Sequence, residues 1–137
     1  MKKIHLFMLN VAMVFFCSFS QDKVTNVKVN ASNTNDNCVL ANITSNINHD
    51  GKILMNETIQ SNQSKDNLLS LSLGHLKNSN EISFRVECVK WKSNISPGPI
   101  KDSTFNIPLS EVRKHKNYKV EVGISNDGVF INEPNKN

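Results

Sequence analysis

The sequence lacks every short motif that marks a common catalytic or phosphate-binding site. It contains no GxSxG nucleophile turn, no P-loop, no HExxH zinc motif and no glycine run that could hold a phosphate. Of the four histidines, His5 lies in the apolar N-terminal stretch. The other three, His49, His75 and His115, lie in polar contexts, and none is at metal-ligand spacing. These absences predict a protein that is not an enzyme and that holds no metal or other cofactor.

A strong charge imbalance is also absent from most of the chain. The formal net charge is +4, and Lys2 and Lys3 supply two of these charges. If the N-terminal segment is removed, the remaining protein is only weakly basic. This balance does not favour a nucleic-acid partner.

The N-terminus is typical of a secretory signal peptide. Lys2 and Lys3 precede a stretch, residues 4–16, that is apolar except at two positions and is too short to cross a bilayer as a helix. Ser18 and Ser20 are small residues at the positions that a signal peptidase recognises. We therefore expect cleavage after Ser20, which makes residues 1–20 a signal peptide and residues 21–137 one secreted domain without a membrane span.

The alternative at this end is a bacterial lipoprotein in which Cys17 is lipidated and retained. Such sites have a small residue before the cysteine, whereas this chain has Phe16. The signal-peptide interpretation therefore takes precedence, and it removes Cys17 from the mature protein.

Two cysteines then remain, Cys38 and Cys88. An even pair in an exported chain, with no CxxC motif and no Cys/His cluster, predicts one disulfide because the compartment is oxidising. Buried free thiols are the alternative if the chain stays in a reducing compartment.

Asparagine is abundant, and it creates five N-x-Ser/Thr sequons. An AT-rich coding genome is one cause of such a composition. In a eukaryotic source, or a virus of eukaryotes, the sequons predict exposed N-glycosylation sites. They begin at Asn30, Asn42, Asn56, Asn62 and Asn94, and Pro97 weakens the last of them.

Strict alternation of apolar and polar residues predicts the fold. In "NYKVEVGISNDG", Tyr118, Val120, Val122 and Ile124 share one face, and an Asn-Asp-Gly turn leads into a second run at 129–131. In "EISFRVECVKW" the same pattern predicts a strand. Weaker strands are expected at 24–29, 38–44, 52–59, 68–73 and 104–109. Seven or eight short strands, without an amphipathic helix of any substantial length, predict an all-β antiparallel β-sandwich.

Residues 105–128, "FNIPLSEVRKHKNYKVEVGISNDG", resemble the later half of a fibronectin type III domain, with a weaker likeness to the immunoglobulin sandwich. The shared pattern is a short strand, an apolar residue six before a tyrosine, an alternating strand and a turn that ends in glycine. The resemblance implies that Tyr118 is a buried corner tyrosine whose hydroxyl bonds to backbone just upstream, near Val112. It implies the architecture of that family and not its strand topology.

One basic segment surrounds the single tryptophan and is a candidate binding site. Lys90 and Lys92 flank Trp91, just past Cys88. Strand parity places Trp91 on the face opposite the core, where a tryptophan suits recognition. A bulge that returns its ring to the core is the alternative.

The second basic segment is "RKHK", in which Arg113, Lys114 and Lys116 are candidate contacts for an acidic partner. The alternative is a solvated loop, since Glu111 and Glu121 lie on either side of it.

Two functions remain open. The first is a secreted, glycosylated binding module that acts on another extracellular protein, such as a receptor, cytokine or host factor. The second is a carbohydrate- or matrix-binding module in which Trp91 stacks on sugar rings beside Lys90 and Lys92.

The strand after Cys38 contains a conflict between two signals. If Cys38 faces the core, strict alternation places Asn42 inward as well, which does not suit a glycan. We expect an irregular start to the strand, so that Cys38 points inward while the regular part buries Val39, Ala41 and Ile43 and leaves Asn42 facing solvent.

Overall fold

The computed structural model describes residues 24–48, 51–72, 76–77, 79–93 and 103–135. The predicted signal peptide, the sequon at Asn94 and the histidines at 49 and 75 lie outside these ranges.

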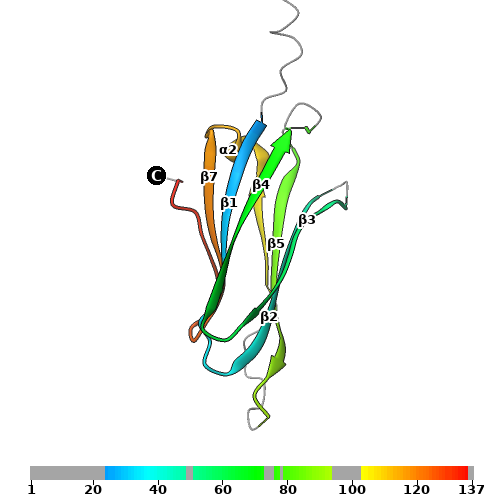
Figure 1. Cartoon of the computed structure of the whole chain (residues 1–137). Coiled ribbons are helices and arrows are strands. Elements are labelled where there is room, and N and C mark those ends of the chain that lie inside the picture. Colours follow the sequence, from blue (N-terminus) through cyan, green and yellow to red (C-terminus); the bar gives the residue numbers. More distant parts are fainter. Residues whose placement is uncertain (1–23, 49–50, 73–75, 78, 94–102, 136–137) are drawn as a thin grey trace, which may run out of the picture.

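Within these described ranges, eight strands form two four-stranded sheets that pack face to face (Figure 1). Sheet A has the strand order β4-β1-β7-β8, and sheet B has the order β3-β2-β5-β6. The strands are β1 (Val24–Asn33), β2 (Cys38–Ile47), β3 (Ile53–Gln60), β4 (Gln63–Ser72), β5 (Glu81–Trp91), β6 (Ser103–Pro108), β7 (Asn117–Ser125) and β8 (Gly128–Asn132). The predicted β-sandwich is confirmed, and every pairing is antiparallel except that β1 runs parallel to β7.

A single turn of helix, α2 (Leu109–Val112), joins β6 to β7. Its two apolar residues, Leu109 and Val112, are fully buried, so it closes the core at that end of the sandwich. In the described ranges no helix is long and apolar enough to span a membrane.

The alternating residues of β5 and β7 supply much of the core. Tyr118, Val120, Val122 and Ile124 are at most 1% exposed, and Phe84 is fully buried opposite them in sheet B. The Asn-Asp turn also forms as predicted, because β7 and β8 pair antiparallel up to Ser125 and Gly128. Period-two patterning therefore located these strands correctly.

Cys38 and Cys88 form the predicted disulfide, with their Cα atoms 5.9 Å apart. Their strands, β2 and β5, are neighbours in sheet B, so the bond lies within one sheet. In antibody domains the conserved disulfide joins the two sheets instead.

The start of β2 is irregular, as the parity conflict predicted. Its register against β5 shifts on both sides of Leu40, and Cys38, Ala41 and Ile43 are all fully buried. Val39 was expected in the core but is only half-buried, because it falls inside the irregular stretch where alternation does not hold. Asn42 lies on the outer face of sheet B and is half-buried. Its side-chain amide donates hydrogen bonds to Asn56 and to the backbone oxygen of Glu57.

Tyr118 is buried as expected, but the predicted partner of its hydroxyl is wrong. The phenol donates a 2.7 Å hydrogen bond to Oε1 of Glu133 and not to backbone near Val112. Glu133 follows β8, which lies beside β7, so its carboxylate reaches the phenol from the neighbouring strand. Burial, and then the bond to Glu133, raise the pKa of Tyr118.

Gly123 lies where β7 passes closest to β1. A Cβ atom at this position would be 2.1 Å from the backbone oxygen of Ser32, which is far inside van der Waals contact. Only glycine allows this approach, so the residue is required by the parallel pairing of the two strands.

Two buried asparagines hold the loop between β1 and β2. The Asn33 side chain donates to the carbonyl oxygens of Cys38 and Ile59, at 3.1 and 3.2 Å. The side-chain oxygen of Asn35 accepts from the backbone N–H groups of residues 37 and 38, and its amide donates to Ser125 O. These bonds satisfy backbone groups that the turn would otherwise leave unpaired.

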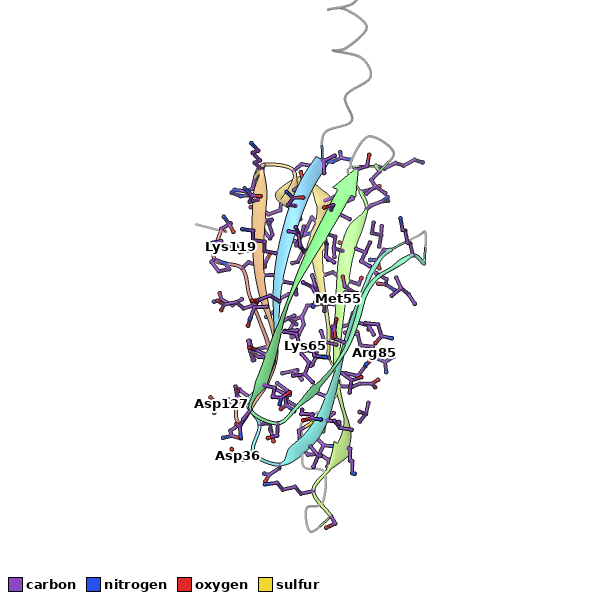
Figure 2. The ribbon with its side chains drawn as sticks, viewed as in Figure 1. Asp36, Met55, Lys65, Arg85, Lys119 and Asp127 are labelled. Atoms are coloured by element: carbon purple, nitrogen blue, oxygen red, sulfur yellow. A yellow bond between two sulfur atoms is a disulfide. The ribbon has the colours of Figure 1, made fainter. Side chains whose placement is uncertain are left out.

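The loop between β1 and β2 also contacts the turn between β7 and β8. Asn126 accepts a bond from the Asp36 N–H and donates to the Asp36 carboxylate, at 2.8 and 2.9 Å. Figure 2 shows Asp36 and Asp127 together at this end of the sandwich. Polar contacts therefore join these two loops at the end opposite α2.

Candidate functional site

The outer face of sheet A carries a solvent-open hollow of about 500 Å³. Its floor is formed by β4, β1 and β7, and Pro134 of the C-terminal segment borders it. The backbone N–H of Lys119 donates to Asn135 Oδ1 at 2.8 Å, which holds that segment beside β7. Figure 2 shows Lys119 on β7.

Strand register divides the floor of the hollow into two rows of opposite charge. In one row, Lys28 of β1 lies between Leu68 of β4 and Lys119 of β7. In the next row, Asn30 lies between Asp66 and Glu121. We call this surface the bipolar hollow.

The basic row has features that strand pairing alone does not explain. Two lysines lie directly opposite each other, an arrangement that costs stability in a sheet. Within the described residues neither lysine has an ion-pair partner. Leu68, next to them, is 59% exposed. The row can therefore offer two cationic groups and an apolar contact to a partner.

The acidic row is already hydrogen-bonded. Asn30 donates to Asp66 at 2.8 Å, and Asn132 donates to Glu121 at 3.1 Å. These bonds orient the two carboxylates without neutralising them. The acidic row can accept hydrogen bonds or pair with a cation.

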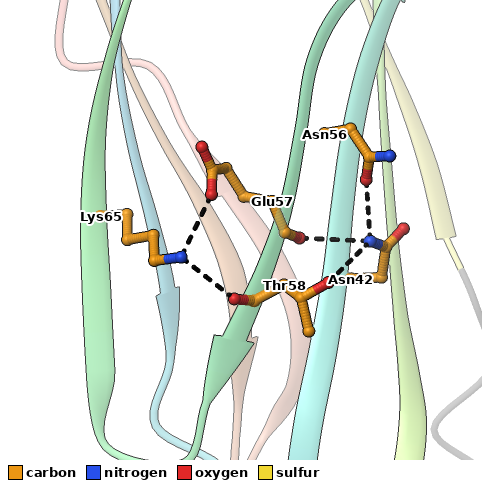
Figure 3. A network of polar contacts seen from close by, with 5 residues as sticks. All are labelled: Asn42, Asn56, Glu57, Thr58 and Lys65. Atoms are coloured by element: carbon orange, nitrogen blue, oxygen red, sulfur yellow. Dashed lines mark hydrogen bonds and ion pairs between the residues drawn. The ribbon is translucent and has the colours of Figure 1, made fainter.

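The outer face of sheet B is different because amide and hydroxyl side chains dominate its rows. Asn42 of β2 lies between Thr58 of β3 and Glu87 of β5, and the adjacent row contains Asn56, Thr44 and Arg85. Figure 3 shows how the Asn42 amide, Asn56 and Thr58 meet on this face. Two of the predicted sequons therefore lie side by side here.

The other two described sequons lie apart from this pair. Asn30 lines the bipolar hollow, and its amide is bonded to Asp66. Asn62 is exposed in the β3–β4 turn, where its φ of 63° is a left-handed conformation that asparagine tolerates well. The described sequons are thus spread over both faces and one end.

Trp91 does not occupy the exposed position that strand parity gave it. The pairing of β5 with β2 skips Val89, and this bulge turns Trp91 so that it is half-buried and packs against the core. Lys90 and Lys92 on either side remain exposed. The alternative in which a bulge returns the ring toward the core is the one the structure supports.

The second basic segment is partly engaged within the protein. The Arg113 guanidinium donates to the backbone oxygen of Leu76, and Lys114 pairs with Glu111 at 3.1 Å. Lys116 is exposed. This segment follows α2, at the Glu81 end of β5, whereas Trp91 ends the same strand. The two predicted basic sites are therefore separated by roughly 30 Å of strand and cannot form one surface.

Sequence reasoning missed the bipolar hollow. Alternation around the buried residues Val27 and Val29 indicates that Lys28 faces outward. Nothing in the sequence indicates that β1 lies beside β7, which is what places Lys28 next to Lys119.

No cluster of three or more potential metal ligands occurs among the described residues. A comparison with protein-family models, with curated proteins and with solved structures finds no match to this chain.

Proposed function

We propose that this chain is an exported, N-glycosylated and non-enzymatic module that binds another extracellular protein, such as a receptor, cytokine or host factor. The disulfide supports an oxidising compartment, because such bonds persist outside the cytosol. The N-terminal sequence pattern supports export through a signal peptide.

The observation that carries the proposal is the bipolar hollow. Lys28 and Lys119 lie together, with no carboxylate partner among the residues that the structure describes, next to the exposed side chain of Leu68. A protein partner would place an acidic side chain over these lysines, an apolar group against Leu68, and a hydrogen-bond donor against Asp66 or Glu121. Charge complementarity of this kind selects a partner and speeds association.

The position of Trp91 gives less support to the carbohydrate-binding alternative. A tryptophan that stacks on sugar rings needs one ring face open to solvent, whereas Trp91 is half-buried against the core. In that alternative Lys90 and Lys92, which are both exposed, would supply most of the contacts.

The test uses fluorescent tetramers of the secreted chain against a panel of cell-displayed extracellular domains. Leu68→Asp places a carboxylate in the hollow, and Val89→Asp is the matched control on the other sheet, since these residues are 59% and 53% exposed. We expect at least one extracellular domain to bind the native chain and the Val89 variant but not the Leu68 variant.

Two results would contradict the binding proposal: no bound domain, or equal binding by both variants. Retention on heparin or a glycan array that disappears in Trp91→Ala would favour the alternative function. The mass of the secreted chain tests export separately, because cleavage predicts an N-terminus at Gln21. A retained, diacylated Cys17 would contradict the signal peptide.

A further inference from the structure

The sequons at Asn42 and Asn56 face each other across β2 and β3. The antiparallel register sets Asn42 opposite Thr58 and Thr44 opposite Asn56, so each asparagine lies opposite the hydroxyl residue of the other sequon. Glycans attached to these two asparagines would therefore lie over the same part of the outer face of sheet B.

The side-chain amides of Asn42 and Asn56 differ in the hydrogen bonds that they make. Asn42 Nδ2 lies 2.9 Å from Asn56 Oδ1, 3.3 Å from the backbone oxygen of Glu57 and 3.4 Å from Thr58 Oγ1 (Figure 3). A backbone carbonyl can only accept, so the Asn42 group that faces Glu57 must be the NH₂ group. Both hydrogens of Asn42 Nδ2 are thus used inside the sheet.

Asn56 takes part in this network only through its side-chain oxygen. Its Nδ2 points away from Asn42 in Figure 3, and the residue is exposed. At Asn56, the nitrogen that would carry a sugar makes no hydrogen bond in this network. At Asn42, the corresponding nitrogen is the central donor of the network.

Lys65 links β3 to β4 beside this network. Its ammonium group donates from β4 to the Glu57 carboxylate at 3.3 Å and to the backbone oxygen of Thr58 at 3.4 Å (Figure 3). The same two residues supply acceptors to Asn42 on the other side of the strand. The acceptors of Asn42 are thus held in place from both sides.

We propose that Asn56 carries the glycan of this pair in the folded protein, and that Asn42 remains an unmodified hydrogen-bond donor. This inference rests on the proposed function, which makes the chain an exported glycoprotein. In the transfer, amide Nδ2 forms a bond to C1 of a lipid-diphosphate-linked oligosaccharide, the C1–O bond to the diphosphate breaks with its electron pair, and Nδ2 loses one proton.

Modification at Asn56 leaves every hydrogen bond of the network intact, because Oδ1 keeps its lone pairs. Modification at Asn42 removes one of two hydrogens that are both in use. The transferase acts on the extended chain before β2 and β3 pair, so either site can be modified at that stage. Chains modified at Asn42 then form a less stable sheet, and the folded, secreted protein is enriched in chains modified at Asn56. Sugars at both sites would crowd each other, since the Asn42 nitrogen lies 2.9 Å from Oδ1 of the Asn56 amide.

Site occupancy in the chain secreted from eukaryotic cells is the first test. Release of glycans by N-glycosidase F in H₂¹⁸O labels each formerly modified asparagine, and peptide mass spectrometry separates the two sites. We expect the label at Asn56 in at least three-fold excess over Asn42. Equal labelling, excess at Asn42, or label at neither site would overturn the proposal.

A pair of variants tests the physical reason. Thr44→Ala removes the Asn42 sequon and leaves its donors, whereas Asn56→Asp removes the other sequon and keeps the acceptor oxygen. Each is compared with its own unglycosylated form made in a bacterial periplasm. We expect a glycan at Asn42 to lower the melting temperature by about 4 °C and a glycan at Asn56 not to lower it. An unchanged melting temperature with Asn42 modified would overturn the proposal.

Exchange of residues 1–20 for the leader of a well-secreted protein separates this inference from export. If only the exchanged chain is secreted and it carries its glycan on Asn56, the proposed function fails and the inference stands. If the native chain is secreted and binds a partner with Asn42 modified, the inference fails alone.

Discussion

The hydrogen bond between Tyr118 and Glu133 predicts how the stability of the protein depends on pH. The tyrosine is fully buried, and its phenol donates to a carboxylate at 2.7 Å. A hydrogen bond to a charged partner contributes about 1.5–3 kcal/mol to stability. Because phenylalanine fills the same space without the hydroxyl, Tyr118→Phe should lower the free energy of unfolding by about 2 kcal/mol at pH 8.

The direction of the pKa shift sets the pH range in which this difference changes. Burial and Glu133 raise the pKa of Tyr118 in the folded protein above the value of about 10 in the unfolded chain. The folded state therefore keeps the phenol proton where the unfolded state has lost it. The stability that comes from this raised pKa is fully present below about pH 10. It decreases as the pH rises further, and about 1.4 kcal/mol of it has been lost at pH 11.

Urea denaturation at pH 8 and pH 11 measures both quantities, with the fluorescence of Trp91, the single tryptophan, as the signal. We expect the stability difference between the native chain and Tyr118→Phe to shrink at pH 11. Val120→Ala, a buried neighbour without a titrating group, is the control and should give the same difference at both pH values. A Tyr118→Phe difference that stays constant between pH 8 and pH 11 would refute the reasoning.

Three further changes test the fold itself. Replacement of Cys38 by serine opens a bridge that spans 50 residues, so the unfolding free energy should fall by about 4 kcal/mol; a non-reducing peptide map with both thiols free in the native chain would contradict the bond. Gly123→Ala places a methyl group 2.1 Å from Ser32 O and should abolish secretion or lower the melting temperature by more than about 10 °C, whereas Ser70→Ala on the exposed face should change it little. Asn33→Ala leaves two buried carbonyl groups without their donor and should cost about 2–4 kcal/mol in urea denaturation, and an unchanged midpoint would show that water replaces the amide.

The parts of the fold that follow from local pattern could be predicted from the sequence. In the sequence of β7, apolar residues occupy every second position from Tyr118 to Ile124, so the sequence predicts both the buried face and the turn that follows. The disulfide followed from the two cysteines that remain when the predicted signal peptide is removed. In each case the decisive information lies within one short segment or in the composition.

The parts that depend on neighbouring strands could not be predicted. The side on which Trp91 lies depends on a bulge that skips Val89, and alternation alone assigns it to the wrong face. The partner of Tyr118 lies beyond a second strand, and the bipolar hollow requires β1 to lie beside β7. These contacts join residues that are 15 positions apart for Tyr118 and Glu133 and about ninety apart for β1 and β7, and no local pattern encodes them.

The parallel pairing of β1 and β7 has a consequence for the order of events during synthesis. The N-terminal strand lies between β4 and β7, so it keeps one open edge until residues 117–125 have been made. Cys38 and Cys88 are both available well before that point, so oxidation can precede completion of sheet A. An emerging chain of this kind exposes a strand edge that can pair with other chains, and a chain whose synthesis stalls before β7 should be most prone to aggregation.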